Sequence, residues 1–415
     1  MSIWTFGANN GLNNVLSSGG FGSGLGYLPG LGGRDMYNID AKVSDCATSD
    51  GNRTGICVRT TSECTNRGGR PLGTCFATPQ YGSNQGSNSG SINSLNGWPQ
   101  QPGIPVGICC FFQVTCGGTI VNNGTYFRNP NAPSPYTDSR ACSVTVQRIR
   151  PDICQIRLDF LVFDLSRPRE GTCDSDRFVV NGQTQNNIIP PICGYNTGQH
   201  IYIDMSATNS PVTLNVLTMA NRNRLFDIRV SQIHCSSIYR APPNCLQYHI
   251  GVQGSIRSFN YDEPTVPSLG GYLNNLDYTI CFKKEPGFCT VTYSVPTVYV
   301  HITDQNQPQE GPTTIPPGRY FNIVPDTATQ NPVGSNEGGA GPYDCPFDYL
   351  FIAGRRLCGY RFNGQLYPPT PNPMTNSEVT DNSTGPIYAR FVSNHQEVGR
   401  GFNLNYRMNP CLIGG

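Results

Sequence analysis

Cysteine spacing is the feature that most constrains how this chain can fold. Among its 415 residues are 18 cysteines, in three groups of six: Cys46 to Cys110, Cys116 to Cys235, and Cys245 to Cys411. Even counts in each segment are typical of local disulfide frameworks that form in an oxidising compartment. The sequence has no CxxC pair, and the adjacent Cys109-Cys110 is a poor clamp for a metal ion. We therefore expect disulfides in all three groups rather than metal sites.

Composition excludes several classes of protein. Only 13% of the residues are charged and the net charge is +1, which argues against a nucleic-acid binder, because such a protein needs a basic surface. No apolar run is long enough to span a membrane, so we expect no membrane span. The first ten residues lack the basic and apolar regions of a signal peptide, so we expect either a mature start or a missing beginning.

Several short stretches alternate apolar and polar side chains with a period of two. In the clearest one, Ile156, Leu158 and Phe160 share one face of the chain. Such alternation predicts antiparallel strands with one buried face, as in a β-sandwich. The pattern recurs at residues 201–205, 212–216, 226–230, 291–295, 387–391 and 402–406. We therefore expect an all-β chain.

Two cysteine motifs occur in both the second and the third group. A C-x-x-D segment at 173–176 is followed by Cys-Gly at 193–194, and a second C-x-x-D segment at 345–348 is followed by Cys-Gly at 358–359. These motifs, set among alternating strands, resemble the CUB domain family. The resemblance implies two antiparallel jelly-roll sandwiches, and its recurrence indicates an internal duplication.

The resemblance also implies a disulfide pairing. In CUB domains one cysteine pair brackets the opening strands and a second pair brackets the C-x-x-D segment. In each group here two cysteines are left over, and we expect them to tie an internal strand to the final one. The expected bonds are Cys116–Cys142, Cys173–Cys193 and Cys154–Cys235 in the first domain, and Cys245–Cys281, Cys345–Cys358 and Cys289–Cys411 in the second.

The first cysteine group lies in a segment with too few apolar residues to build a core, so disulfides must hold it together. Six cysteines can pair in many ways, and spacing alone leaves the connectivity open. The pattern, which ends in Cys109-Cys110, resembles the clip-type knot of arthropod extracellular proteases and their inactive relatives. A long loop at 82–97 departs from a compact knot of that kind. The family's pairing would give Cys46–Cys109, Cys57–Cys75 and Cys64–Cys110.

We expect four segments along the chain. They are a Gly/Asn/Ser-rich head (1–40), a clip-like disulfide-rich domain (41–112), and two CUB-like domains (113–238 and 239–415). A short linker containing Pro242 and Pro243 joins the two sandwiches, and a Pro/Gly/Asn-rich loop at 303–343 is a candidate contact surface. The whole arrangement resembles arthropod extracellular proteins with tandem CUB domains.

Many CUB domains hold a calcium ion on the Asp of the C-x-x-D segment, a Glu before the third cysteine and an Asp in a late loop. In the first domain Asp176 matches, but the Glu position holds Ser166 (or Asp164 in a neighbouring register) and the late loop has no acid. In the second domain only Asp348 matches. Calcium usually requires more than one carboxylate. We therefore expect no metal and no cofactor, and we expect Asp176 and Asp348 to accept backbone hydrogen bonds.

No catalytic constellation is visible in the sequence. There is no Gly-Asp-Ser-Gly run and no HExxH motif, and cysteines in disulfides cannot act as nucleophiles. The histidines are scattered, and we expect surface or strand roles for them: His200, His234, His249, His301 and His395. We therefore expect no catalytic residues and no enzymatic activity.

Two sets of residues point to modification or binding at the surface. Sequons at Asn52, Asn123 and Asn382 permit N-glycans in a secreted chain. Basic loops are weaker candidates for docking an acidic partner or a glycan, namely Arg167 with Arg169, and Arg355 with Arg356.

These observations predict a secreted, extracellular, disulfide-bonded glycoprotein without enzymatic activity. Its expected role is to bind another extracellular protein or a matrix component through the CUB domains. One alternative is a structural protein that self-assembles as a homo-oligomer into a matrix, tube or filament, because its near-zero charge favours association. A second alternative is a regulatory, non-catalytic relative of clip-type protease cascades.

Overall fold

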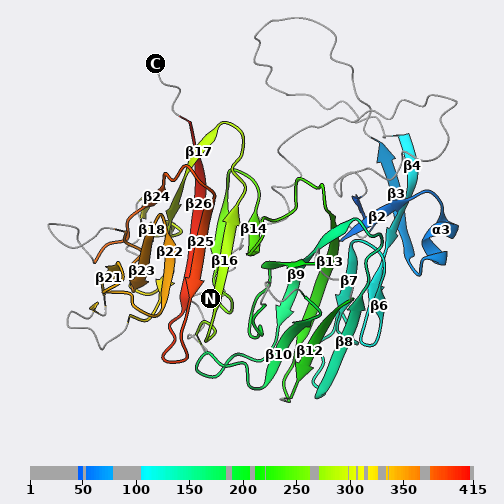
Figure 1. Ribbon diagram of the computed structural model, residues 1–415, viewed down its shortest axis with the longest axis horizontal. Coiled ribbons are helices and arrows are strands. Elements are labelled where there is room, and N and C mark those ends of the chain that lie inside the picture. The colour runs from blue at the N-terminus through cyan, green and yellow to red at the C-terminus, as the bar shows by residue number, and fades with distance from the viewer. Residues whose placement is uncertain are drawn as a thin grey trace, which may run out of the picture. The chain divides into compact units, whose positions relative to one another are not determined.

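The computed structural model describes residues 45–49, 53–77, 104–183, 189–205, 211–219, 221–261, 271–297, 299–304, 307–312, 316–325, 333–334, 336–364 and 374–411 (Figure 1). The Gly-rich head, the 82–97 loop, Asn52 and part of the 303–343 loop lie outside these residues. The chain divides into two compact units. Unit 1 comprises Met1–Gln113 with Asn122–Thr125, and unit 2 comprises Val114–Val121 with Tyr126–Gly415.

Unit 1 is a small four-stranded sheet with one helix. The strand order is β1-β2-β4-β3. The elements are β1 (Asp45–Ala47), β2 (Thr54–Val58), α3 (Thr61–Asn66), β3 (Arg70–Ala77) and β4 (Ile104–Phe111). Thr60 caps the helix by accepting a hydrogen bond from the backbone N–H of Glu63, which satisfies one of the free donors of the first turn.

Disulfides hold unit 1 together because its buried apolar cluster is small, consisting of Ile56, Val58, Cys64, Cys110 and Phe112. The bonds are Cys46–Cys109, Cys57–Cys75 and Cys64–Cys110, the same pairs that the clip-type resemblance implies. The two neighbouring cysteines of β4 therefore join the central strands to β1 on one side and to α3 on the other.

Unit 2 contains two β-sandwiches. The first packs the sheet β10-β12-β8-β6 against the sheet β11-β9-β13-β7-β5. Its strands are β5 (Gln113–Val114), β6 (Thr119–Ile120), β7 (Thr125–Arg128), β8 (Arg140–Val146), β9 (Ile153–Asp164), β10 (Asp176–Asn181), β11 (His200–Asp204), β12 (Val212–Thr218) and β13 (Leu225–His234). Ile156, Leu158 and Phe160 are fully buried, which confirms the alternation expected from the sequence.

The second sandwich pairs the sheet β14-β16-β25-β22-β23-β21 with the sheet β15-β26-β17-β24, and β20 joins β26. Its strands are β14 (Cys245–His249), β15 (Gln253–Arg257), β16 (Asp277–Phe282), β17 (Phe288–Ser294), β20 (Phe321–Asn322), β21 (Gly338–Ala340), β22 (Tyr349–Ile352), β23 (Arg355–Gly359), β24 (Val379–Asp381), β25 (Ile387–Val392) and β26 (Gly401–Pro410). A separate hairpin consists of β18 (Tyr299–Asp304) and β19 (Gln307–Pro312).

The order of strands repeats between the two sandwiches. The run β6-β8-β12-β10 corresponds to β14-β16-β25-β22, and in both runs the first strand pairs in parallel with the second while the others pair antiparallel. The C-x-x-D segments correspond as well, because Asp176 is the first residue of β10 and Asp348 directly precedes β22. This repetition agrees with the expected duplication and with the expected all-β fold.

Six disulfides close the two sandwiches, at corresponding places in each. They are Cys116–Cys142, Cys154–Cys235 and Cys173–Cys193 in the first, and Cys245–Cys281, Cys289–Cys411 and Cys345–Cys358 in the second. These are the pairs that the CUB resemblance implies. Among the described cysteines none is free.

The segment between the sandwiches is docked onto the first one. Ala241 is buried, and Gln155 of β9 both donates to its carbonyl and accepts from its N–H, at 2.9 and 2.8 Å. Gln155 alternates with the core residues of β9 and so points away from the core, but it is only 3% exposed because this segment covers it. The linker is thus part of a packed junction.

Candidate binding surfaces and the C-x-x-D ends

The outer face of the β14-β16-β25-β22-β23-β21 sheet carries large aromatic and basic side chains. Tyr349 and Phe351 alternate with buried residues on β22, and Tyr388 and Arg390 do so on β25. Phe351 lies opposite Arg390 on one side and opposite Arg356 on the other. Tyr388 is 39% exposed. We call this surface, made of Tyr349, Phe351, Arg356, Tyr388 and Arg390, the aromatic–arginine face.

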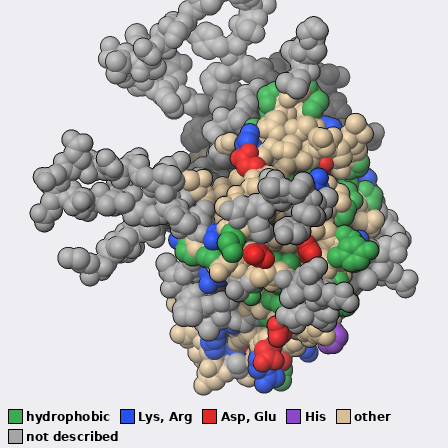
Figure 2. Space-filling view, turned by 90° about the vertical axis from the view of Figure 1, so that its left-hand side faces the viewer, with side chains coloured by type: hydrophobic (Ala, Val, Ile, Leu, Met, Phe, Trp, Pro, Cys, Tyr) green, Lys and Arg blue, Asp and Glu red, His purple; other side chains and the backbone are tan. Residues whose placement is uncertain are grey.

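Contacts within the aromatic–arginine face hold its side chains in place. The rings of Phe351 and Tyr388 stack with centroids 6.2 Å apart, and the guanidinium of Arg356 lies 4.3 Å from the Tyr349 ring centroid. Arg390 makes a two-pronged ion pair with Asp277 at 2.7 and 2.6 Å. Tyr343 and Phe347 are also exposed, at 88% and 52%, on the segment that leads into β22. Figure 2, which shows the surface on the left-hand side of Figure 1, has hydrophobic side chains beside acidic and basic ones.

The corresponding sheet of the first sandwich has a different outer face. Ser143 donates a hydrogen bond to the Asn215 side chain at 2.7 Å, and Thr145 lies opposite Thr213. On β12 the residues Thr213 and Asn215 stand where β25 has Tyr388 and Arg390, and on β10 Val179 stands where β22 has Phe351. The stacked aromatic pair of the second sandwich therefore has no counterpart on the first.

The two sandwiches meet in a junction rich in amide side chains. Asn260 accepts hydrogen bonds from Arg167 at 3.2 Å and from the Tyr195 N–H at 3.1 Å, while its own backbone N–H donates to the Asn196 side chain at 2.9 Å. Gly194 approaches so closely that a Cβ there would lie 1.9 Å from the Asn260 Oδ1 atom. The glycine that follows Cys193 is thus required by the junction.

A second part of the junction contains two histidines, of which His200 is buried and His249 is half-buried. Nε2 of His200 lies 3.1 Å from the N–H of Tyr248 and 3.0 Å from its carbonyl, and the ring of His200 lies 4.9 Å from that of His249. Burial lowers the pKa of His200 well below its usual value, and burial together with Arg157 lowers the pKa of His249 to about 3. Both rings are therefore neutral in this packing.

The basic loop at 167–170 belongs to the junction rather than to a free surface. Arg167 stacks over Tyr195 and bonds to Asn260. The backbone of the same loop receives Asn274, which donates to the carbonyls of Gly171 at 2.9 Å and Glu170 at 2.7 Å. Arg169 points away into solvent, where it pairs with Asp174.

Arg355 and Arg356 do not form one cluster, because consecutive residues of a strand point to opposite faces. Arg356 belongs to the aromatic–arginine face and also donates to the Pro346 carbonyl at 2.9 Å. Arg355 is exposed and donates to the carbonyl of Gly364. Of this pair, only Arg356 lies beside aromatic rings that could form a docking surface.

The C-x-x-D aspartates accept backbone hydrogen bonds, as expected. The N–H groups of Ser166 and Met219 donate to Asp176, and that of Asn394 donates to Asp348. Asp176 also pairs with the guanidinium of Arg224, and both side chains are inaccessible to solvent. Burial would raise the pKa of Asp176, but hydrogen bonds from Arg224 and Ser166 outweigh it and lower the pKa to about 2.

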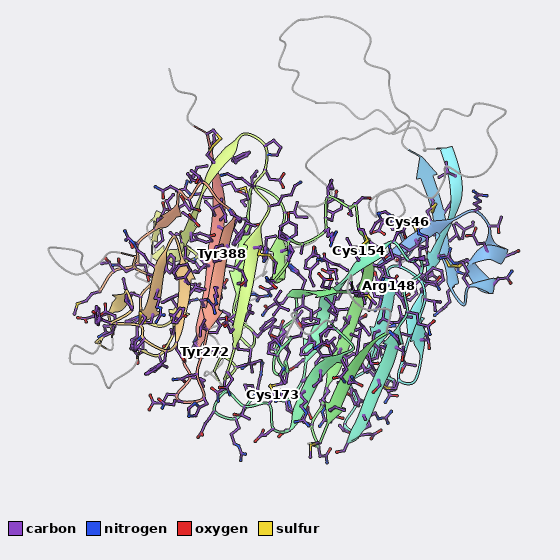
Figure 3. The ribbon with its side chains drawn as sticks, in the orientation of Figure 1. Cys46, Arg148, Cys154, Cys173, Tyr272 and Tyr388 are labelled. Atoms are coloured by element: carbon purple, nitrogen blue, oxygen red, sulfur yellow. A yellow bond between two sulfur atoms is a disulfide. The ribbon has the colours of Figure 1, made fainter. Side chains whose placement is uncertain are left out.

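In the second sandwich Asp348 has a neutral partner. The hydroxyl of Tyr272 donates to it at 2.6 Å, and burial raises the pKa of Asp348. Tyr272 lies among the loops at the end of the sandwich, whereas Tyr388 lies on β25 (Figure 3). Asp348 and Glu397 line a hollow of about 100 Å³ together with Val324, Pro325, Phe347, Asn394 and Gln396.

His234 joins Asp152 and Ser236 in a chain of hydrogen bonds. Nε2 lies 2.6 Å from the Asp152 carboxylate and Nδ1 lies 2.8 Å from the Ser236 hydroxyl. The Ser236 backbone N–H also donates to Nδ1 at 3.2 Å, and Ser236 is exposed in a turn. A catalytic serine needs donors for an oxyanion and a site that excludes water. This chain of contacts instead ties the start of β9 to the end of β13, beside Cys154–Cys235.

The sequons lie in different settings. Asn382 is exposed directly after β24, where a glycan would meet solvent, while Asn123 is only partly exposed. Over the described ranges, no group of three or more His, Cys, Asp or Glu side chains could hold a metal ion. Within the same part of the chain, none of the helices has both the length and the apolar character needed to cross a bilayer.

Comparison with protein families decides the identity of the two sandwiches. The CUB domain model matches residues 116–228, and the animal CUB domain model matches residues 242–409. Both sandwiches are CUB domains. The chain belongs to the CUB family through these two domains, hereafter the first and the second CUB domain. CUB domains with this number of disulfides indicate an extracellular protein.

Solved structures of CUB-containing proteins are similar to this chain at low identity. The CUB1-EGF-CUB2 region of human MASP-1/3 is 16% identical, with 69% of this chain and 100% of that one covered and a TM-score of 0.22. The extracellular region of zebrafish Gpr126/Adgrg6 is 13% identical, with 72% and 38% covered and a TM-score of 0.24. No curated protein matches the chain.

The family's calcium site can be tested against the residues present. In the first CUB domain the only matching carboxylate, Asp176, is bonded through both oxygens to Arg224. In the second, Asp348 already accepts hydrogen bonds from the Tyr272 hydroxyl and the Asn394 N–H. Calcium usually requires several carboxylates free to coordinate it. The residues of neither domain fit the ion.

Sequence reasoning missed the aromatic–arginine face, the histidine pair and the partner of Asp176. The face could have been predicted in part from the sequence, because its residues alternate with apolar ones along two short stretches. These residues are Tyr349, Phe351, Tyr388 and Arg390. No sequence signal brings His200 near His249 or Arg224 onto Asp176, because these contacts depend on how distant segments pack.

Proposed function

We propose that this protein is a secreted, non-enzymatic binding protein whose second CUB domain docks another extracellular protein through the aromatic–arginine face. The observation that carries the proposal is the contrast between corresponding sheets: one presents the stacked rings of Phe351 and Tyr388 beside arginines, and the other presents Val179 and Thr213 at the same two positions. Tyr and Arg are the residues most enriched among those that dominate binding energy in interfaces.

The face favours a protein partner with apolar ridges and carboxylates. Phe351 lies between two cross-strand arginines, so an apolar contact at its ring would be flanked by donors for acidic groups. Stacking and cation–π contacts already order these side chains in the free protein. Binding therefore loses less side-chain entropy. The packed junction further fixes the face relative to the first CUB domain.

A site-specific photocrosslinker tests the proposal. The crosslinking residue is placed at Tyr388 in one version and at Thr145, on the corresponding sheet, in a matched control. Both proteins are exposed to native extracellular fluid. We expect one foreign protein to be crosslinked at position 388 and not at 145, with binding weakened about 30-fold in the Phe351→Ser/Tyr388→Ser variant. Equal crosslinking from both positions, or unchanged affinity in the double variant, refutes the proposal.

Light scattering after size exclusion separates this function from self-assembly. A constant mass of 45.2 kDa plus any glycan, across concentration, supports a foreign partner. A mass that grows with concentration supports the alternative of a self-assembling structural protein. In that case crosslinks from position 388 would join two copies of the chain.

The non-enzymatic part of the proposal has its own test. His234 is the one described histidine with both a carboxylate and a hydroxyl partner, so Ser236 is the residue to change. We expect the wild-type protein and Ser236→Ala to be equally inactive on p-nitrophenyl esters and on a mixed peptide library. Turnover that Ser236→Ala abolishes would establish an enzyme.

A further inference from the structure

The Asp176 end of the first CUB domain is organised around a buried guanidinium. Nε of Arg224 donates to Oδ2 of Asp176 at 2.6 Å and Nη2 donates to Oδ1 at 3.0 Å. Nη1 donates to two backbone carbonyls, those of Thr137 at 2.9 Å and Arg222 at 3.0 Å. The guanidinium therefore gathers both oxygens of a carboxylate and two carbonyl oxygens around one positive charge.

These oxygens come from segments far apart in the sequence. Asp176 opens β10, Thr137 precedes β8, and Arg222 lies just before β13. The Asp176 carboxylate also accepts from the N–H and hydroxyl of Ser166, and from the N–H of Met219. One cation and one anion thus tie together three loops at the end of the sandwich.

The ligand set is the kind that a hard metal cation collects. Calcium takes carboxylate and backbone carbonyl oxygens, often from several loops at once. Here the positive charge that such oxygens require is already present on a side chain that is 1% exposed. An arginine also supplies directed N–H donors, which match a carboxylate in the bidentate manner seen with Asp176.

We infer that Arg224 is a tethered replacement for the calcium ion of the CUB fold, so that the first CUB domain keeps its end ordered independently of calcium. The substitution accounts for the missing second carboxylate, because a monovalent guanidinium needs only one. This end of the first CUB domain would then stay ordered where calcium is scarce or chelated.

The second CUB domain has no equivalent of the Arg224–Asp176 pair among its described residues. Arg400 directly precedes β26 as Arg224 directly precedes β13, but no described lysine or arginine pairs with Asp348. There a tyrosine hydroxyl occupies the corresponding role beside the carboxylate. The two ends of the duplicated fold have therefore diverged, and only the first carries its own cation.

Hydrogen exchange measured by mass spectrometry on the full chain tests the inference locally. The reporters are peptides that cover Ser166 and Met219, whose N–H groups bond to Asp176. In the wild-type protein we expect identical exchange in 5 mM calcium chloride and in EDTA. In Arg224→Ala we expect exchange at least tenfold faster in both solutions, since the one carboxylate left at this end is too few to hold calcium.

Two further variants keep the outcome interpretable. Arg390→Ala removes a bidentate arginine–aspartate pair of similar geometry from the exposed surface, so it should leave the reporter peptides unchanged. If Arg224→Ala fails to fold, Arg224→Lys keeps the charge without the fork and should show an intermediate loss of protection. Calcium-sensitive exchange in the wild-type protein, or wild-type exchange rates in a folded Arg224→Ala variant, overturns the inference.

Discussion

Acidification should lower the free energy of unfolding of unit 2, because it favours protonation of the two histidines at the junction, His200 and His249. His200 is 8% exposed, and the Nε2 atom of His249 is buried without a hydrogen-bond partner. His249 is half-buried; its ring stacks on Phe282 and makes an edge contact with Tyr406. The perturbation is a shift from pH 7.5 to pH 5.5, compared with a variant that lacks both titrating rings.

The magnitude follows from proton linkage. The folded-state pKa of each histidine lies below its unfolded value of 6.5, so the unfolded chain binds protons that the folded chain does not. The free energy of unfolding therefore falls as the pH drops through 6.5, and for His249 the loss continues down to about pH 3. Between pH 7.5 and 5.5 the loss is on the order of 1 kcal/mol for each histidine, or roughly 3 kcal/mol at most for the pair.

The groups around the pair set the sign of the effect. Arg157 faces both rings and opposes their protonation. Arg157 is itself paired with Asp159 and bonded to the Tyr202 hydroxyl, so those side chains are already engaged. On the other side Glu285 pairs with Lys283 and receives the Gly251 N–H. No described acid forms an ion pair with either ring to offset a new positive charge.

Urea unfolding at the two pH values, followed by fluorescence, measures the effect. The wild-type protein should lose up to about 3 kcal/mol of unfolding free energy between pH 7.5 and 5.5 beyond what His200→Gln/His249→Phe loses. His395→Gln, which changes an exposed histidine, is the matched control and should lose as much as the wild type. Equal pH dependence in the wild type and the double variant would refute the assignment of the acid sensitivity to this pair.

Three other perturbations test the junction and the disulfides. Asn260→Ala should destabilise unit 2 by roughly 1–3 kcal/mol in urea, because it leaves two part-buried donors without their acceptor; a change below about 0.5 kcal/mol would contradict the junction. Gly171→Ala should lower the melting temperature, because the residue has φ +78° and an added Cβ would lie 2.3 Å from Asn274; calorimetry showing no shift would count against that contact. Replacing Cys345 and Cys358 with serine should cost about 3 kcal/mol, and peptide mapping without reduction should first show that the two are bonded.

Local patterns in the sequence were enough to predict the sandwiches. Alternation around Leu158 and the C-x-x-D segments identified strands that the structure contains, because a strand with one buried face has a period of two. The CUB resemblance supplied cysteine pairs that are the bonded pairs of the structure. These features depend on neighbours in sequence or on motifs with fixed spacing.

The candidate sites were harder to predict because they depend on packing between distant segments. Arg167 looked like an exposed docking residue, yet the fold turns it onto Tyr195 and Asn260. Asp176 was expected to bond to amides only, while Arg224 comes from 48 residues away to neutralise it. Neither relationship has a period or a spacing that a sequence displays.

The paired cysteines of β4 have a consequence for proteolysis. Cys109 and Cys110 reach Cys46 in β1 and Cys64 in α3, while β3 is held by Cys57–Cys75. A single peptide-bond cut anywhere between residues 78 and 103 would therefore separate the chain into two pieces that remain covalently joined by two bonds. The cut protein would migrate as one species until reduction released an N-terminal fragment, so a nicked and an intact molecule would look the same in any assay that leaves the disulfides oxidised.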